Sequence, residues 1–101
     1  MNQHEIILYQ IENTNICVNV MFENETFWMT QKAMAELFDV NVPAISKHLT
    51  NIYDEEELIK KSTVSKMEIV QKEGQRNVKR MPEFYNLDAI IAVGYRVNSY
   101  K

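Results

Sequence analysis

Hydrophobic and polar residues alternate with a period of two through much of the first thirty residues. From Ile16 to Phe22 every second residue is β-branched or aromatic, which is typical of a strand with one buried face. The pattern predicts, in order, a strand at 5–11, a turn at 12–15, a strand at 15–22, a turn at 23–25 and a short strand at 26–29. The first two strands are expected to form an N-terminal β-hairpin. Trp28 is expected to anchor the core under the helices that follow, rather than to stack on a base.

The hydrophobic period lengthens to that of a helix after Thr30, which is a good N-cap for a helix from about Gln31 to Phe38. Residues 39–41 form the next turn. A second helix begins at Val42 or Pro43, because proline is tolerated in a first helical turn. Its buried stripe is predicted from helical spacing as Val42, Ile45, Leu49, Ile52 and Tyr53.

Residues 31–50 have the spacing of a helix-turn-helix that enters the DNA major groove. The small residue Ala35 falls where two crossing helices must approach closely. Asp39 opens the turn where glycine is common, and aspartate tolerates the positive φ that this place favours. An ordinary helical hairpin in a mixed core has a similar pattern, so that alternative stays open.

The last third of the chain predicts a second hairpin and a terminal helix. Residues 63–85 read as two strands around a glycine turn at 72–75, and Pro82 is expected at a bulge or a sheet edge. A helix begins at 86–88, with one face predicted to contain Leu87, Ile90, Ile91, Gly94 and Tyr95. The expected fold is an α+β winged helix-turn-helix. It comprises an N-terminal β-hairpin, a C-terminal wing hairpin and a terminal helix in one domain over residues 1–101.

The formal net charge of −3 hides an uneven distribution. Residues 1–59 hold two lysines against ten acidic residues, a local charge of −8, whereas residues 60–81 hold seven basic residues against two acidic ones, a local charge of +5. A phosphate-facing patch on a mildly acidic domain gives this pattern, and so does a solvated lysine-rich hairpin that contacts nothing.

No catalytic constellation is visible in the sequence, so we expect no enzyme, no cofactor and no metal site. Gly74 and Gly94 are the two glycines and cannot form a phosphate-binding loop. No apolar run is long enough to span a membrane, and the N-terminus lacks a secretory pattern, so a cytoplasmic protein is expected. The single cysteine, Cys17, is expected to be a buried structural thiol.

Ten residues are candidates for contact with double-stranded DNA: Gln31, Asn41, Pro43, Ser46, Lys47, His48, Thr50, Arg76, Lys79 and Arg80. Ser46 and Lys47 are expected on the outer face of the second helix, within reach of base edges or flanking phosphates. Asn41 either caps that helix or contacts a phosphate, and His48 is either a partly buried structural residue or a phosphate contact. The three hairpin residues contact phosphates or an adjacent minor groove, or remain solvated charges.

Three stretches resemble the virulence protein RhuM family of bacterial proteins, often encoded on mobile or prophage-like elements. They are EIILYQ at 5–10, FWMTQKAMAELFDVNVPAISKHLTNIY at 27–53 and FYNLDAIIAVGYRVNS at 84–99. The family pattern W-x-T-Q-x-x-M-A-x-L-F-x-V, followed by I-S-x-H-L-x-N-I, is matched from Trp28 to Ile52. The chain is also distantly similar to phage antirepressor-type DNA-binding domains. The resemblance implies the N-terminal part of a longer protein.

The expected function is sequence-specific binding of double-stranded DNA, in transcriptional regulation linked to a mobile element. A homodimer is expected, because such motifs usually gain affinity over two half-sites. A further protein partner is expected through the C-terminal region of the longer protein. The alternative function is an antirepressor-like module that binds another regulator.

Overall fold

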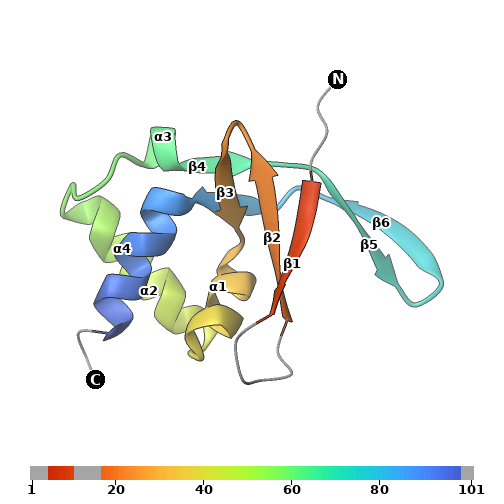
Figure 1. The fold of residues 1–101 in the computed structure, drawn as a ribbon, viewed down its shortest axis with the longest axis horizontal. Coiled ribbons are helices and arrows are strands. Elements are labelled where there is room, and N and C mark those ends of the chain that lie inside the picture. Colours follow the sequence, from red (N-terminus) through yellow and green to blue (C-terminus); the bar gives the residue numbers. More distant parts are fainter. Residues whose placement is uncertain (1–4, 11–16, 99–101) are drawn as a thin grey trace.

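A computed structural model describes residues 5–10 and 17–98 (Figure 1). In chain order the elements are β1 (Glu5–Gln10), β2 (Cys17–Glu23), β3 (Thr26–Met29), α1 (Gln31–Phe38), α2 (Val42–Asp54), α3 (Lys60–Thr63), β4 (Val64–Lys66), β5 (Ile69–Glu73), β6 (Arg76–Arg80), β7 (Glu83–Asn86) and α4 (Leu87–Asn98). The mixed α+β class expected from the sequence is confirmed.

Five strands form an antiparallel sheet in the order β1-β2-β3-β7-β4. Ile7 of β1 pairs with Val20 of β2, which confirms the N-terminal hairpin, although its predicted turn at 12–15 falls wholly outside the described residues. β7 joins β3 through the pair Met29 and Tyr85, so the sheet links the two ends of the chain.

The main core lies between the helices and one face of this sheet. Its fully buried side chains come from α1, α2, α4 and β2, and they include Met34, Ile45, Ile52, Val93 and Val18. The predicted stripe of α2 is confirmed at Ile45, Leu49 and Ile52, whereas Val42 at the start of the helix is exposed. Each buried aliphatic side chain contributes about 1.5–3 kcal/mol, so this layer fixes how the helices sit on the sheet.

A second, smaller core covers the opposite face of the sheet and corrects the placement of Trp28. It consists of Met21, Trp28, Met67 and Phe84. Trp28 is buried as expected, and its indole Nε1 donates to the Glu23 carbonyl at 2.9 Å. It does not lie under the helices, because successive strand residues point to opposite faces and the next residue, Met29, faces them.

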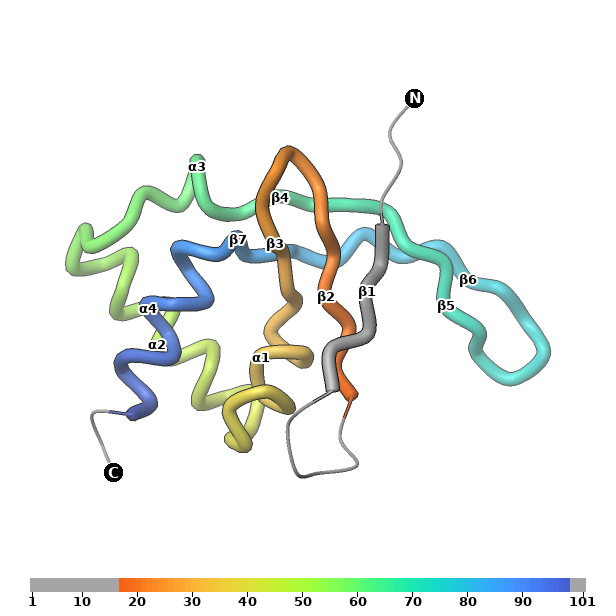
Figure 2. The backbone as a smooth tube through the Cα atoms, in the orientation of Figure 1, coloured from red at the N-terminus to blue at the C-terminus, as the bar shows by residue number. Residues whose placement is uncertain are grey.

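The predicted hairpin over residues 63–85 is two separate ladders. β4 pairs with β7 inside the main sheet, whereas β5 and β6 form a two-stranded sheet of their own. The ladders separate at Met67 and Pro82, where the Met67 amide donates to the Pro82 carbonyl at 3.3 Å. Because proline lacks the N–H that a ladder needs, the chain leaves the main sheet here. Figure 2 shows the β5–β6 hairpin extending away from the helices.

The predicted common face of α4 is wrong. Ile90 and Gly94 are buried, but Leu87, Ile91 and Tyr95 are exposed, so the apolar residues of this helix divide between two faces. The buried face also contains Ala89, Ala92, Val93 and Val97. Small residues on that side let α4 approach its neighbours closely, which leaves the larger side chains outside.

Cys17 also differs from its prediction. Its free thiol is exposed at the first residue of β2, not buried. Alternation explains this, since the next residue, Val18, takes the core-facing place.

Candidate nucleic-acid interface

Two capped helices joined by three residues form the helix pair, α1 and α2 with residues 39–41 between them. The Thr30 hydroxyl accepts from the Ala33 amide at 3.1 Å and so caps α1. The Asn41 side-chain oxygen accepts from the Ala44 amide at 2.8 Å and caps α2. Asn41 therefore has the capping role of the two that its sequence position left open. Both caps satisfy amides that would otherwise lack intrahelical partners.

The turn between the helices depends on a left-handed residue. Asp39 has φ 56° and ψ 49°, as its place in the sequence predicts. This conformation lets the amides of Asp39 and Val40 both reach the Ala35 carbonyl and end α1. The chain can then reverse within three residues, and α2 begins beside α1.

The outer face of α2 carries short or polar side chains. Ser46, Lys47 and Thr50 are exposed, as are Asn41 and Pro43 at the start of the helix. The opposite side of α2, with Ile45, Leu49 and Ile52, is buried in the core, so the outer face is the side of α2 that a partner can contact. These side chains are short enough for α2 to approach a groove closely, and Lys47 gives the outer face one positive charge.

His48 stands at the edge of this face and is partly buried. Burial lowers its pKa below the usual value of 6.5, and the positive charges of Arg96 and Lys47 lower it further. The imidazole is therefore neutral at pH 7 and adds no charge to the surface.

Gln31 is tied into the fold. Its side-chain amide donates to the Tyr85 hydroxyl at 2.9 Å, which joins the start of α1 to β7. Burial raises the pKa of Tyr85, so the hydroxyl stays protonated and available. The sequence gives no sign of this pair, because the two residues are far apart along the chain.

Strand register splits the basic residues of the hairpin between two faces. Val70 pairs with Lys79 and Lys72 with Asn77, so the two lysines share one face. Arg76 and Arg80 share the other. All four basic side chains are exposed.

The Arg80 guanidinium is held by a neighbour on its own face. It donates to both carboxylate oxygens of Glu73, through Nη2 at 2.9 Å to each oxygen and through Nε at 3.1 Å to Oε2. This ion pair neutralises much of the charge of Arg80 locally. The predicted trio Arg76, Lys79 and Arg80 therefore does not form one surface, and the lysine face is the more positive of the two.

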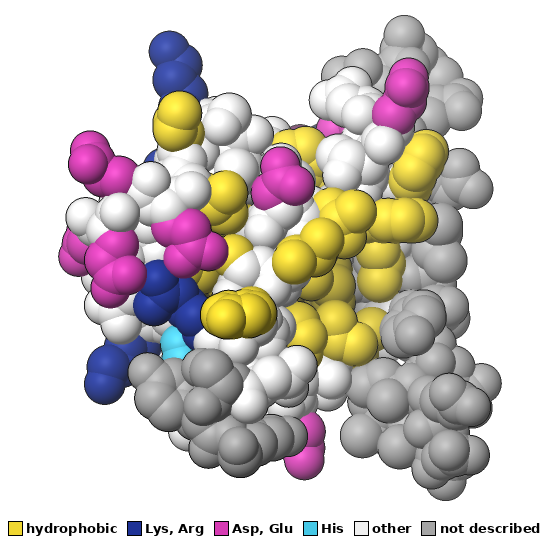
Figure 3. Space-filling view, turned by 60° about the vertical axis from the view of Figure 1, so that its left-hand side comes forward, with side chains coloured by type: hydrophobic (Ala, Val, Ile, Leu, Met, Phe, Trp, Pro, Cys, Tyr) yellow, Lys and Arg dark blue, Asp and Glu magenta, His cyan; other side chains and the backbone are white. Residues whose placement is uncertain are grey.

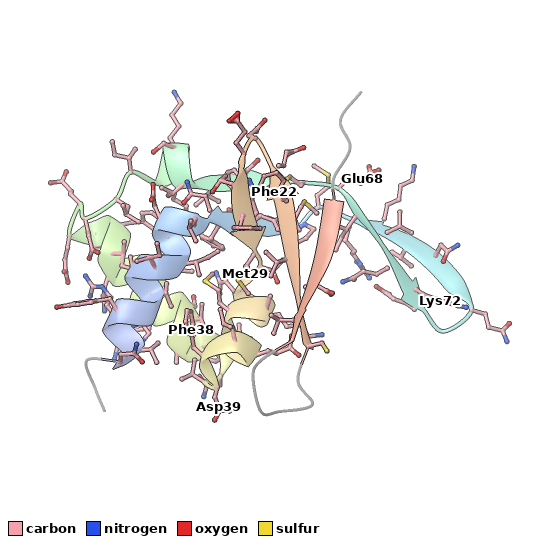
Figure 4. The ribbon with its side chains drawn as sticks, in the orientation of Figure 1. Phe22, Met29, Phe38, Asp39, Glu68 and Lys72 are labelled. Atoms are coloured by element: carbon pink, nitrogen blue, oxygen red, sulfur yellow. The ribbon has the colours of Figure 1, made fainter. Side chains whose placement is uncertain are left out.

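α2 and the β5–β6 hairpin lie towards opposite ends of the longest axis of the molecule, with α1 between them (Figure 1). A hollow of about 340 Å³ lies between α1 and β5. Its lining includes Lys32 and Glu36 of α1, Val70 and Gln71 of β5, and Cys17 and Asn19 of β2. Figure 4 places Lys72 on the projecting hairpin and Asp39 at the lower end of α1. The molecule spans 40 Å along this axis.

An ion-pair cluster fixes the acidic end of α2, and the sequence does not reveal it. Arg96 of α4 donates through Nη2 to Glu55 and to Glu57, both at 2.9 Å. These hydrogen bonds raise the pKa of Arg96, which remains fully charged. Two of the four acidic residues at 54–57, Glu55 and Glu57, thus brace α4 against the segment after α2.

The described residues hold no group of three or more His, Cys, Asp or Glu side chains placed to bind a metal ion. None of their helices is long and apolar enough to cross a membrane. The fold is a mixed α+β domain with antiparallel sheets, four helices in the described residues and a projecting basic hairpin.

Residues 62–101 match the sequence model of the virulence protein RhuM family, which confirms the family resemblance over that segment. The matched range contains β4 to β7 and α4, and the helix pair lies before it. No curated protein and no solved structure matches the chain.

Proposed function

We propose that this domain binds double-stranded DNA as a winged helix-turn-helix, with α2 as the reading helix and the β5–β6 hairpin as the wing. The observation that carries the proposal is the division of α2 into a buried apolar stripe and an outer face of Ser46, Lys47 and Thr50. A helix in the major groove needs such a face, with short side chains that donate and accept hydrogen bonds. The biological role that follows is transcriptional regulation linked to a mobile element, in keeping with the family of residues 62–101.

Affinity and specificity would come from different parts of this surface. Glu36 and Asp39 line the same hollow of the helix pair as Lys32, and Lys47 is the one Lys or Arg of α2, so the helix pair gains little attraction for phosphates. The lysine face of the hairpin, with Lys72 and Lys79, supplies positive charge without a competing acidic residue on the same strand face. We therefore assign sequence reading to α2 and most phosphate contact to the hairpin. Gln31 is left out of the contact surface, because its amide is bonded to Tyr85.

The salt dependence of binding to a random-sequence duplex tests the electrostatic part. We expect log affinity to fall linearly with log salt concentration, and Lys79→Ala to reduce the slope by about 0.9 for one lost phosphate contact. Lys60→Ala, which removes an exposed lysine from α3, is the matched control and leaves the slope unchanged. A flat slope, or no duplex binding at low salt, contradicts DNA binding and favours the alternative of a module that binds another regulator.

Duplex length tests whether both parts engage one DNA molecule. The 40 Å length of the molecule limits the stretch that one copy can cover to about 12 base pairs at 3.4 Å each. Affinity should rise with length up to that size at most and then level off. A plateau that Lys79→Ala leaves at the same length means that the hairpin does not engage the duplex beside α2.

Selection from a random duplex pool tests the reading helix. Ser46→Ala with Lys47→Ala should flatten the sequence preference more than it lowers overall affinity, because these side chains reach base edges. Lys79→Ala is the opposite control, with lower affinity and the preference retained. A preference that survives the α2 changes intact excludes α2 as the reader.

A further inference from the structure

An exposed apolar surface runs along the outer side of α4 and onto the sheet beside it. Leu87, Ile91 and Tyr95 repeat every four residues and are 40, 60 and 76 % exposed. Phe22 and Phe27 pair across β2 and β3 with their rings 5.3 Å apart, and they are 37 and 40 % exposed. Figure 3 shows hydrophobic side chains gathered in a continuous region on this side of the molecule. We call these five residues the α4 patch.

The sheet places both halves of the α4 patch on one side. Met29 packs in the core with Ile90 and Val93 of α4, and Phe27 precedes it by two residues, so Phe27 points to the same face of the sheet. Five large side chains at about 200 Å² each when fully exposed leave roughly 500 Å² of apolar surface in contact with water. Scattered apolar residues are normal on a surface, but a contiguous patch of this size marks an interaction site.

We propose that the occupant of the α4 patch is a second copy of this chain, with the two α4 helices packed antiparallel about a twofold axis at Ile91. Such an axis places Ile91 against itself and Leu87 against the partner's Tyr95, so the stripe is complementary to itself, as a twofold interface requires. Asp88 lies exposed in the first turn of α4. Antiparallel packing separates the two Asp88 carboxylates, whereas parallel packing sets these like charges side by side.

The area predicts how strong the dimer is. A standard interface buries about 800 Å² on each partner, and the α4 patch with a polar rim approaches that value from below. We therefore expect a monomer–dimer equilibrium in about the micromolar range. The proposal does not depend on DNA binding, because the α4 patch and the outer face of α2 share no residue.

Sedimentation velocity over a range of protein concentrations tests the association. The unchanged chain should shift from monomer to dimer as concentration rises, and Ile91→Glu should remain monomeric. Ile59→Glu is the matched control, since Ile59 is 70 % exposed and lies outside the α4 patch, and it should dimerise like the unchanged chain. Both variants should keep the same far-ultraviolet circular dichroism, because each replaces an exposed side chain. A chain that stays monomeric at every concentration, or an Ile91→Glu variant that still dimerises, overturns the proposal.

Disulfide trapping tests the geometry. In a Cys17→Ser background, which removes the exposed native thiol, Ile91→Cys should form an intermolecular disulfide on mild oxidation. Leu87→Cys mixed with Tyr95→Cys should cross-link more readily than either variant alone. If Leu87→Cys cross-links preferentially with itself, the antiparallel arrangement is wrong. If Ile91→Cys does not cross-link with itself and Leu87→Cys cross-links neither with Tyr95→Cys nor with itself, the interface is wrong.

Discussion

Asp39 holds the turn of the helix pair in a conformation that costs free energy for any residue with a side chain. Its φ of 56° and ψ of 49° lie in the left-handed region, where the Cβ atom approaches the following carbonyl oxygen. Asp39→Gly removes that contact and keeps the backbone hydrogen bonds to the Ala35 carbonyl, because those use only main-chain atoms. We therefore predict that this substitution stabilises the fold.

Two opposing contributions set the size of the effect. Relief of the left-handed conformation favours the variant by about 1–2 kcal/mol, with aspartate at the lower end because its short polar side chain tolerates this region. Glycine loses more backbone entropy on folding, which costs about 0.5–1 kcal/mol. The net gain expected for Asp39→Gly is about 0.5 kcal/mol, or an increase in Tm of roughly 2–4 °C for a domain of this size.

Urea unfolding followed by circular dichroism measures this difference directly. The midpoint should rise while the dependence on urea concentration stays constant, since the surface exposed on unfolding is unchanged. Glu36→Gly is the control, because it places glycine at an exposed position inside α1 and should destabilise the fold by about 1 kcal/mol. If Asp39→Gly lowers the midpoint as Glu36→Gly does, the left-handed residue is not strained and the reasoning is wrong.

Two further substitutions test packing and electrostatics. A Cβ atom at Gly94 would meet the Phe38 ring at 3.0 Å, so Gly94→Ala should lower the free energy of unfolding by about 1 kcal/mol even after its gain in helix propensity. Adding Phe38→Leu to the same chain should recover most of that lost stability, as measured by urea unfolding. The folded-state pKa of His48 is lowered by burial and then by Arg96 and Lys47, so its neutral form is favoured in the fold. The free energy of unfolding should therefore fall as pH drops from 6.5 through that lowered pKa, and His48→Gln should remove this part of the pH dependence, whereas an NMR titration that gives a pKa above 6.5 contradicts it.

Local features of the sequence predicted the local structure well. The helix of Gln31–Phe38, its cap at Thr30 and the left-handed Asp39 all follow from residues within a few positions of each other. The strand alternation before Trp28 predicted the N-terminal hairpin for the same reason. Periods, caps and turns depend on neighbours in the chain, so one sequence suffices to find them.

Contacts between segments far apart in the sequence could not be predicted from these local patterns. The side of the sheet on which Trp28 lies depends on where α4 and β7 return, more than fifty residues later. Alternation shows that a strand has two faces but does not show which one the helices cover. The hydrogen bonds of Arg96 to Glu55 and Glu57 likewise depend on how α4 packs against the rest of the fold, and the spacing of these residues in the sequence does not predict them.

The candidate site has the same limits. The exposure of Ser46 and Lys47 could be predicted, because a helix with a known buried stripe has a known outer face. The separation of Lys79 from Arg80 could have been predicted too, since adjacent strand residues point to opposite faces. The ion pair that holds Arg80 to Glu73 could not, because it depends on the twist of the hairpin.

The two faces of α4 connect the parts of the molecule that the proposals use. Its inner face, with Ile90 and Val93, packs in the same core as Ile45 of α2, and Arg96 braces the segment that follows α2. Its outer stripe, centred on Ile91, is the surface assigned to a second copy. A dimer formed there would relate two α2 helices through α4 and the core that α4 shares with α2. A change in how α4 packs would therefore alter the separation of the two α2 helices, and on the proposed function this separation sets the spacing of the two half-sites.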